Sequence, residues 1–547
     1  MEIAMTPRRV LASVGAVAMA LAVLPLSSSA ATSAPADRSR PIVSQAVTFD
    51  VSRPMRDVPA RAAPDDTGGN LAERGAAAPA DTGHRADPAL QTTAGSGMPG
   101  PVVSFEGLSN ADNPRMVSPP DPVGDVGLQH YVEMVNLTWA VYSKTGQRLY
   151  GPATLGSIWD GFLADCERSS GDPIVLYDEI ANRWLLSQFS TTGPEYFNCV
   201  AISTTQDPLG SYYRYAFSTG PNFPDYPKYG VWPDAYYITT REFAPDDAES
   251  IGVYAVDRRQ MLTGNPDPRM VGFNYATPRH LVGDGILPAD LDGNRLPPPG
   301  SPGYFAGSMD SGYRPDGAPF DALNVFQMKV DWSKPAASTF THTASVPTGD
   351  FDSVFPCNPG SRDCIDQPDT SNEIDVLSYR QRPTWRLAYR NFGTHESLVT
   401  NQSVEARKGQ AGVRWWELRN PSHPVIHQEG TYAPDDGVHR WMGSAAMDSA
   451  GNLAVGYSVS NGKDVYPGIR YAGRLASDPA GELGQGEAVL IAGSGSQTGS
   501  ARWGDYTSLN VDPKDDCTFW YVNEYYETTS SRGWQTRIGA FRFPGCA

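Results

Sequence analysis

Short runs of apolar residues, alternating with polar ones and separated by Gly, Pro, Asn and Asp, fill the chain from Val102 onward. A period of two is typical of β-strands, and the separating residues favour tight turns. One strand type recurs with starts at Thr138, Asn198, Ile251, Leu323, Gly412, Gly468 and Thr536. The recurrence indicates an architecture built from one repeated, strand-rich unit.

Each unit is predicted to hold about four antiparallel strands, most clearly over residues 174–218. Seven units predict an all-β fold, a seven-bladed β-propeller over residues 101–547, in which a ring of blades protects the strand edges. The last unit lacks one strand, and residues 102–108 (VVSFEGL) are expected to supply it and so close the ring. The alternative is a pair of β-sandwich domains, which does not require copies of one strand.

The first hundred residues have a different composition. Arg8 and Arg9 precede an uncharged stretch over residues 10–26 and then small residues, which predicts a signal peptide over residues 1–30. Residues 31–100 are rich in Ala, Pro, Asp, Arg, Gly and Thr, which predicts a disordered linker or pro-segment. We therefore expect a secreted, extracellular protein, and no later apolar stretch predicts a membrane span.

Export to an oxidising compartment favours disulfide bonds among the six cysteines. Short sequence separations favour the pairs Cys166 with Cys199, Cys357 with Cys364, and Cys517 with Cys546. The chain has no CxxC pair and no two-Cys, two-His spacing, so a zinc site is not predicted.

Composition excludes several classes of function. Lys plus Arg number 43 and Asp plus Glu 61, a net charge of −18, which repels a nucleic-acid backbone. The sequence contains no GxSxG, HExxH, P-loop or EF-hand motif, so serine hydrolases, zinc proteases and nucleotide enzymes lose support. The 12 Trp, 26 Tyr and 19 Phe supply enough apolar area for a large core.

Candidate chemistry lies where the innermost strands of a propeller begin, because these strands converge at a channel where ligands usually bind. An Asp follows Gly or Pro at this point in five units, at Asp125, Asp172, Asp225, Asp284 and Asp505. A ring of carboxylates can bind a Ca²⁺ ion. Mutual repulsion can also keep one carboxyl of the ring protonated, so that it acts as a general acid. A repeated Asp can equally be a turn device that accepts backbone N–H bonds. Asp172, Asp225 and Asp505 are the acid and base candidates.

Departures from the repeat give the candidates for substrate binding. Arg440 and Arg502 are predicted to bind a carboxylate or sulfate, since the guanidinium fork matches planar anions. Trp441 and Trp503 are predicted to stack on sugar rings. The alternative pairs each Arg with a neighbouring Asp and buries each Trp between blades. Two further binding candidates follow Asp225, namely Tyr226 and Lys228.

A second catalytic candidate is the pair His395 and Glu396, which follows Arg386 in the fifth unit. A His beside a carboxylate can carry out acid and base chemistry, although a surface turn explains the pair equally. The longest gaps in the repeat contain LPPPGSPG from Leu296 and the loop between Cys357 and Cys364. These inserts are predicted to form a lid over one face.

The fragment Ser308-Met-Asp310-Ser-Gly312 and the unit openings resemble the secreted propellers of the sialidase-like and BNR-repeat group. That group carries an aromatic residue soon after the Gly of its Asp-box, and here Tyr313 follows Gly312 directly. The resemblance implies an arginine cluster, an acid Asp and a Tyr with its Glu. Only Arg440 and Arg502 are candidate counterparts, so no catalytic assignment follows from it. Through GDPIVLYD, RWMGS and RWGDY, the chain also resembles uncharacterised bacterial secreted propeller proteins.

These patterns predict a secreted, monomeric, carbohydrate-active propeller, a glycoside hydrolase or lyase that acts on an acidic extracellular glycan. A non-catalytic glycan-binding or adhesion module that uses the same face is the main alternative. A scaffold without a ligand is a third.

Overall fold

The computed structural model describes residues 40–60, 85–275, 279–312, 317–353, 363–376 and 381–546. Over these residues the protein is all-β with few and short helices, namely α1 (Arg258–Leu262), α2 (Arg279–Val282) and the 3₁₀ turns η1 (Met55–Asp57), η2 (Asn110–Asp112), η3 (Leu155–Trp159) and η5 (Pro335–Ala337). None of the described helices has the length and apolar character needed to span a membrane.

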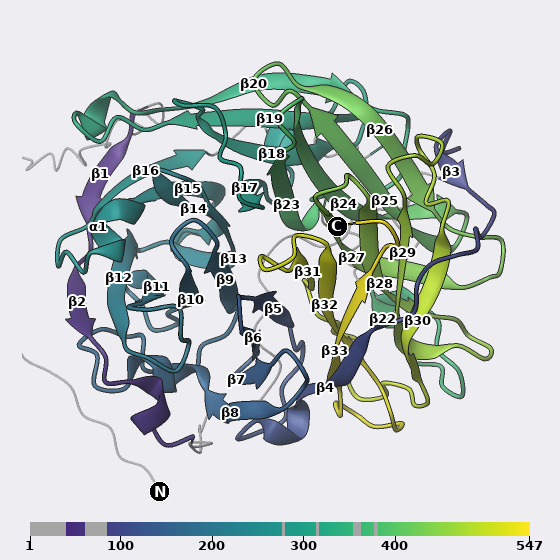
Figure 1. Ribbon diagram of the computed structural model, residues 1–547, viewed down its shortest axis with the longest axis horizontal. Helices are drawn as coiled ribbons and strands as arrows, with labels where there is room; N and C mark the ends of the chain where they lie inside the picture. Colours follow the sequence, from purple (N-terminus) through teal and green to yellow (C-terminus); the bar gives the residue numbers. More distant parts are fainter. Residues whose placement is uncertain are drawn as a thin grey trace, which may run out of the picture. The chain divides into compact units, whose positions relative to one another are not determined.

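Most strands form runs of four that are consecutive in the chain and antiparallel to one another (Figure 1). The first three runs are β5 (Val123–Val126), β6 (His130–Val135), β7 (Thr138–Ser143) and β8 (Arg148–Thr154); β9 (Ile174–Asp178), β10 (Arg183–Phe189), β11 (Tyr196–Ser203) and β12 (Tyr212–Gly220); and β13 (Phe223–Val231), β14 (Ala235–Phe243), β15 (Glu249–Asp257) and β16 (Arg269–Tyr275).

The next two runs are β17 (Leu287–Asp292), β18 (Gly303–Met309), β19 (Ala322–Lys329) and β20 (Thr339–Pro347); and β23 (Thr384–Asn391), β24 (Glu396–Arg407), β25 (Gln410–Arg419) and β26 (Val425–Tyr432). The last two are β27 (His439–Met447), β28 (Leu453–Ser460), β29 (Tyr466–Arg474) and β30 (Gly486–Gly493); and β31 (Ser508–Val511), β32 (Thr518–Tyr525) and β33 (Gln535–Arg542), completed by β4 (Val103–Ser109). A separate two-stranded sheet is formed by β21 (Asp363–Ile365) and β22 (Ile374–Asp375).

The strand type that recurs in the sequence takes the third place in every run, as β7, β11, β15, β19, β25, β29 and β33. Its predicted strand character is confirmed. The strand predicted at residues 102–108 is observed as β4, and it pairs antiparallel with β33, as in Ile538 opposite Phe105.

The first strands of successive runs contact one another in the order β5, β9, β13, β17, β23, β27 and β31, and β31 contacts β5. Figure 1 shows these strands on the inner side of their runs, with the fourth strands outside. Two runs are not separate sheets, because β17 also pairs in parallel with β23 and so joins them.

The described parts of the predicted linker are ordered, which corrects the prediction of disorder over residues 31–100. β1 (Ile42–Gln45) pairs with β16, β2 (Thr48–Val51) pairs with β12, and β3 (Leu90–Gln91) pairs in parallel with β26. Each segment adds to a free outer edge of a sheet, where backbone hydrogen bonds order a chain that is poor in large apolar residues.

Aromatic side chains from different runs pack against one another in the core. Trp232 lies across from Tyr389 with ring centroids 4.7 Å apart, which joins the third and fifth runs. Tyr131 of the first run stacks on Trp520 of the last at 5.4 Å. The first and last runs therefore share one hydrophobic cluster.

Two of the three predicted disulfides are present, Cys166 with Cys199 and Cys517 with Cys546. The third remains a prediction, since Cys357 lies outside the described residues.

Candidate functional site

A cluster of charged and aromatic side chains lies where the first strands begin. We call it the entry cluster and define it as Asp121, Asp172, Asp225, Tyr226, Lys228, Arg382, Arg502, Asp505, Tyr506 and Glu524. These residues stand just before β5, β9, β23 and β31, at the irregular part of β13, and on β32. Residues far apart in the sequence thus meet at one end of the inner strands.

Local backbone geometry places several of these side chains. Asp121, Asp172 and Tyr226 each precede a proline and adopt φ values of 45°, 46° and 51°. Positive φ is uncommon for residues other than Gly, and the residue before Pro normally prefers extended backbone. Strained backbone of this kind clusters at functional sites, where the surrounding fold holds it in place.

Hydrogen bonds join the carboxylates of neighbouring runs. The backbone N–H of Asp505 donates to Oδ1 of Asp121 at 2.7 Å, and Nδ2 of Asn136 donates to Oδ2 of the same carboxylate at 2.8 Å. Oδ1 of Asn136 in turn accepts from the N–H of Asp172 at 2.8 Å. Asn136 therefore connects Asp121 to the backbone that carries Asp172.

Burial and mutual repulsion favour the protonated forms of two of these carboxyls. Burial, together with the charge of Asp505, raises the pKa of Asp121 to about 7. Burial, followed by the charges of Asp121 and Asp225, raises the pKa of Asp172 well above its usual range. A carboxyl that keeps its proton near neutral pH can act as a general acid.

Cationic side chains lie against aromatic rings in the same cluster. Nζ of Lys228 is 3.5 Å from the ring centroids of both Tyr226 and Tyr506, and the guanidinium carbon of Arg382 is 3.4 Å from that of Tyr226. Such contacts stabilise a buried positive charge. Nζ of Lys228 also donates to the carbonyl of Pro227 at 2.9 Å.

Two arginines flank one carboxylate. Nη2 of Arg382 is 3.5 Å from Oδ2 of Asp505, and Nη2 of Arg502 is 3.5 Å from Oδ1. Nε of Arg502 also lies 3.7 Å from Oδ2 of Asp375. The pair of guanidinium groups stabilises a negative charge on Asp505.

Several buried polar atoms of the cluster have no hydrogen-bond partner among the residues that the structure describes. They are Nε and Nη1 of Arg382, the hydroxyl of Tyr506 and Oε2 of Glu524. Arg382 is only 2% exposed. A buried polar group without a partner costs about 1–3 kcal/mol, so these atoms favour a ligand that supplies complementary groups.

The structure thus brings together Asp172, Asp225, Asp505, Tyr226, Lys228 and Arg502, six of the residues singled out from the sequence. The other two Asp residues of the sequence pattern support the sheets instead. Asp125 accepts from the N–H of Tyr177 at 2.6 Å, and Asp284 lies 3.7 Å from Arg241.

The predicted tryptophan pair is buried in the core. Trp441 and Trp503 are 0% and 1% exposed, and their ring centroids are 5.5 Å apart. Their rings present no accessible face to a sugar, which corrects the prediction that they stack on the substrate. The alternative, burial between blades, describes them better.

Arg440 does not point into the entry cluster. It pairs with Asp436 at 2.7 Å and with Glu487 at 2.8 Å, and its guanidinium lies over the ring of Tyr432. The neighbouring Trp441 occupies the opposite face of β27 because strand side chains alternate. The predicted joint grip of Arg440 and Arg502 on one anion is therefore wrong, since Arg440 is already neutralised by its own carboxylates.

His395 and Glu396 lie at the other ends of the inner strands. β23 begins next to Arg382 and ends at Asn391, after which the turn carries His395. Eight residues of strand span roughly 26 Å. The pair therefore belongs to a different site from Asp172 and Asp505.

Sequence reasoning missed Asp121, Arg382, Tyr506 and Glu524. One signal was available, since each of Asp121, Asp172, Tyr226 and Arg382 precedes a proline, just before a first strand or, for Tyr226, within the first half of β13. Tyr506 follows the predicted Asp505. Glu524 carried no signal, because it lies on the second strand of its run and reaches the cluster by accepting from the N–H of Gly504.

Among the described residues, no group of three or more His, Cys, Asp and Glu side chains has the arrangement of a metal site. The predicted Ca²⁺ ion therefore gains no support from this part of the chain.

No protein-family model and no curated protein matches the chain. Among solved structures it is similar to a polysaccharide lyase, with 9% identity over 78% of this chain and 90% of that chain and a TM-score of 0.34. It is also similar to an α-L-arabinanase of Penicillium chrysogenum complexed with arabinobiose (8% identity, 59% of this chain, 94% of that chain, TM-score 0.29). A third is a thermostable family-43 glycoside hydrolase (12% identity, 69% and 91%, TM-score 0.26).

At these TM-scores the similarity supports no conclusion about the fold or activity of this chain. None of the three structures is a sialidase by name, so the resemblance to the sialidase-like group remains a prediction.

Proposed function

We propose that the protein is a secreted, carbohydrate-active β-propeller of seven four-stranded blades that cleaves an acidic glycan at the entry cluster. The runs of four strands, the successive contacts of their first strands and the pairing of β4 with β33 support the blade arrangement. The core shared by the first and last runs supports closure of the ring.

One observation carries the proposed chemistry, namely two carboxyls of contrasting environment in one buried cluster. Burial and the charges of Asp121 and Asp225 raise the pKa of Asp172 and favour its protonated form, whereas two guanidinium groups stabilise the charge of Asp505. Glycoside hydrolysis uses such a pair, one as the acid for the leaving oxygen and one as base or nucleophile. Asp172 is the proposed acid, and Asp505 and Asp225 are the candidate bases.

Arg382, and not Arg440, is the residue proposed to bind the anionic group of the substrate. Its buried Nε and Nη1 have no partner among the described residues, and both can donate to a carboxylate or sulfate of the substrate. Arg502 adds positive charge in the same cluster. An acidic glycan satisfies these donors better than a neutral one.

A lyase reaction is the second candidate function, because the environment of Lys228 favours a neutral amine. Burial lowers the pKa of its ammonium well below the usual range. A neutral amine is a base that can remove the proton next to a uronate carboxylate, which leads to elimination instead of hydrolysis.

A panel of acidic and neutral polysaccharides tests the proposal, with new reducing ends and unsaturated products measured separately. Hydrolysis yields reducing ends without unsaturation, and elimination yields both. Asp172→Asn and Asp505→Asn are each expected to lower the rate by about 100-fold or more, in the range of positioned acid and base groups. Asp435→Asn changes an exposed carboxylate outside the cluster and serves as the control. Retention of full activity in both cluster variants contradicts the proposal.

A further inference from the structure

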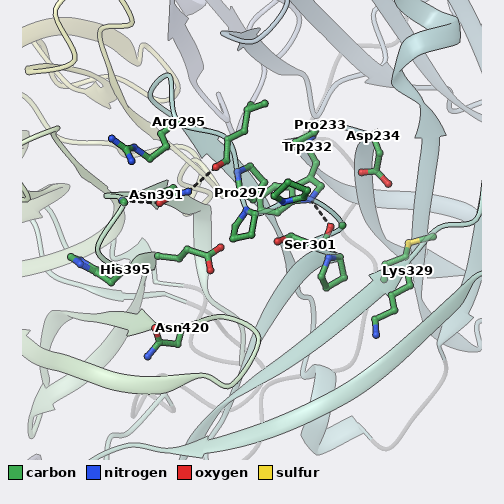
Figure 2. Close-up of a pocket in the computed structure, with 18 of the residues that line it drawn as sticks. Trp232, Pro233, Asp234, Arg295, Pro297, Ser301, Lys329, Asn391, His395 and Asn420 are labelled. Atoms are coloured by element: carbon green, nitrogen blue, oxygen red, sulfur yellow. Dashed lines mark hydrogen bonds between the residues drawn. The ribbon is translucent and has the colours of Figure 1, made fainter.

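A cavity lies at the carboxyl ends of the inner strands, away from the entry cluster. Its volume is about 990 Å³, the size of a site for a small molecule or a short oligosaccharide. It is lined by the turn after β13, the loop between β17 and β18, the end of β19, the turn between β23 and β24, and Asn420. We call it the exit pocket; Figure 2 shows the residues around it.

The loop between β17 and β18 forms a rigid wall of the exit pocket. It contains Pro297, Pro298, Pro299 and Pro302, each of which fixes its own φ angle. Nδ2 of Asn391 donates to the carbonyl of Leu296 at 2.7 Å, and the N–H of Ser301 donates to the carbonyl of Pro298 at 3.0 Å. The wall is therefore shaped before any ligand arrives, which lowers the entropic cost of binding.

Polar side chains occupy both sides of this wall. Arg295, Asn391, His395 and Asn420 lie on one side in Figure 2, and Asp234 and Lys329 lie on the other. Glu396 also lines the pocket, and its Oε1 accepts from the hydroxyl of Tyr389 at 2.6 Å. The lining thus combines proline rings with amide, carboxylate and cationic groups.

The positive and negative side chains that line the exit pocket are equal in number, so the pocket has no net charge. Arg295 and Lys329 oppose Asp234 and Glu396, and burial together with the charge of Arg419 lowers the pKa of His395, so its imidazole is neutral near pH 7. A site without net charge gives no preference to an ion. The entry cluster differs, because its unpartnered guanidinium atoms favour an anion.

We propose that the exit pocket is a second binding site, separate from the entry cluster, and that it takes an uncharged oligosaccharide. A sugar ring has apolar C–H faces, which suit the proline rings, and hydroxyl groups at its edge, which suit Asn391, Glu396 and Asn420. The site unites two features that the sequence singled out, the LPPPGSPG insert and the His395 and Glu396 pair.

Calorimetric titration of the full chain with neutral hexasaccharides of glucan, xylan and galactan type tests this site. At least one is expected to bind, and Glu396→Gln is expected to weaken it by about 10-fold, the loss of roughly one charged hydrogen bond. Gln at this position can still accept from Tyr389, so the fold is retained. Glu195→Gln alters a turn glutamate outside the pocket and is expected to leave the affinity unchanged.

A second measurement does not depend on the variant. Hydrogen exchange of residues 293–302 and 391–396 is expected to slow when the neutral sugar is saturating. Failure of every neutral oligosaccharide to bind at about 10 mM overturns the proposal, as does binding that Glu396→Gln leaves unchanged or that protects other segments instead. Inactivity of the entry cluster does not affect this test, because the two sites use different residues.

Discussion

A proline follows the functional side chain at several places where the inner strands begin. A following proline favours extended backbone, yet Asp121, Asp172 and Tyr226 adopt positive φ, a strained conformation. The surrounding fold must therefore hold these residues in place.

The guanidinium group of Arg382 is predicted to bind the anionic group of the substrate. Arg382→Lys keeps a positive charge but removes the fork, so affinity for an acidic oligosaccharide is expected to fall by about 10-fold or more. The measurement is a calorimetric titration alongside a melting curve. Arg440→Lys changes an arginine with its own carboxylate partners and is the matched comparison. Equal losses in the two variants count against a binding role for Arg382.

The pH dependence of activity tests the proposed role of Asp172. Its raised pKa means that it is protonated at pH values where an ordinary Asp, with a pKa of about 4, has already ionised. A general acid must carry its proton, so activity is expected to persist above the pH at which an ordinary Asp ionises and to fall at higher pH. A profile of kcat/KM against pH measures this. A rate that is already falling between about pH 4 and pH 5 rules out this assignment.

The sequence predicted part of the cluster because its Asp residues recur after Gly or Pro. It could not separate Asp172 and Asp505 from Asp125 and Asp284, since the same dipeptide serves both the cluster and the sheets. Arg440 and the two Trp residues stood out as departures from the repeat, but their burial and partners depend on neighbouring runs. Pairings of this kind are set by tertiary contacts that a local pattern does not contain.

At the scale of elements, the segment over residues 85–102 acts as a strap across several runs. Arg85 pairs with Asp310 and Asp321, and Asp87 pairs with Arg414 at 2.7 Å. Further along, the hydroxyl of Tyr471 donates to the carbonyl of Pro99 at 2.8 Å. Buried ion pairs replace apolar contacts here, which is why composition alone predicted disorder.

Removal of the strap's carboxylate is expected to destabilise the protein strongly. The side chains of Asp87 and Arg414 are 1% and 0% exposed, so Asp87→Ala leaves a buried charge with one partner fewer, at a cost of about 3 kcal/mol. Arg53→Ala breaks the Arg53–Asp160 pair, whose members are 52% and 57% exposed, and is expected to cost less than about 1 kcal/mol. Denaturant unfolding of both variants checks this. Comparable losses contradict the structural role of the strap.

The repeated strands were predictable because the third strand of every run has the same polarity pattern. Pattern also located β4, which lies more than four hundred residues from its partner β33. The parallel pairing of β17 with β23 left no trace in the sequence, since strands buried on both faces, such as these, do not alternate. The edge strands β1, β2 and β3 are too short to show a period.

At the scale of the whole molecule, buried carboxyls make stability depend on pH. Burial raises the pKa of Asp121 and of Glu133 to about 7 and that of Asp290 to about 6. In the unfolded chain these groups ionise near pH 4, so between about 4 and 7 the folded state binds more protons. Their stabilising contribution is therefore complete below about pH 4 and lost as the pH rises through about 7.

A buried histidine changes the pH dependence of stability in the opposite direction. Burial lowers the pKa of His439, so the unfolded state binds the extra proton below about pH 6.5 and stability from this group falls with acidification. Burial also lowers the pKa values of His130, His342, His395 and His427. Burial raises the pKa values of more carboxyls, among them also Asp125, Asp172, Glu179 and Glu524. The melting temperature is therefore expected to be higher at about pH 5.5 than at about pH 8. A series of melting curves from pH 5 to pH 9 measures this. A melting temperature that rises steadily with pH contradicts the stabilising role of these buried carboxyls.

The entry cluster is proposed to bind an acidic glycan through Arg382 beside Asp172 and Asp505. A crystal structure of Asp172→Asn with an acidic oligosaccharide is the decisive experiment. A carboxylate or sulfate of the sugar is expected within hydrogen-bond distance of Nε or Nη1 of Arg382, with a glycosidic oxygen next to residue 172. An acidic sugar bound only in the exit pocket or on an outer face contradicts it.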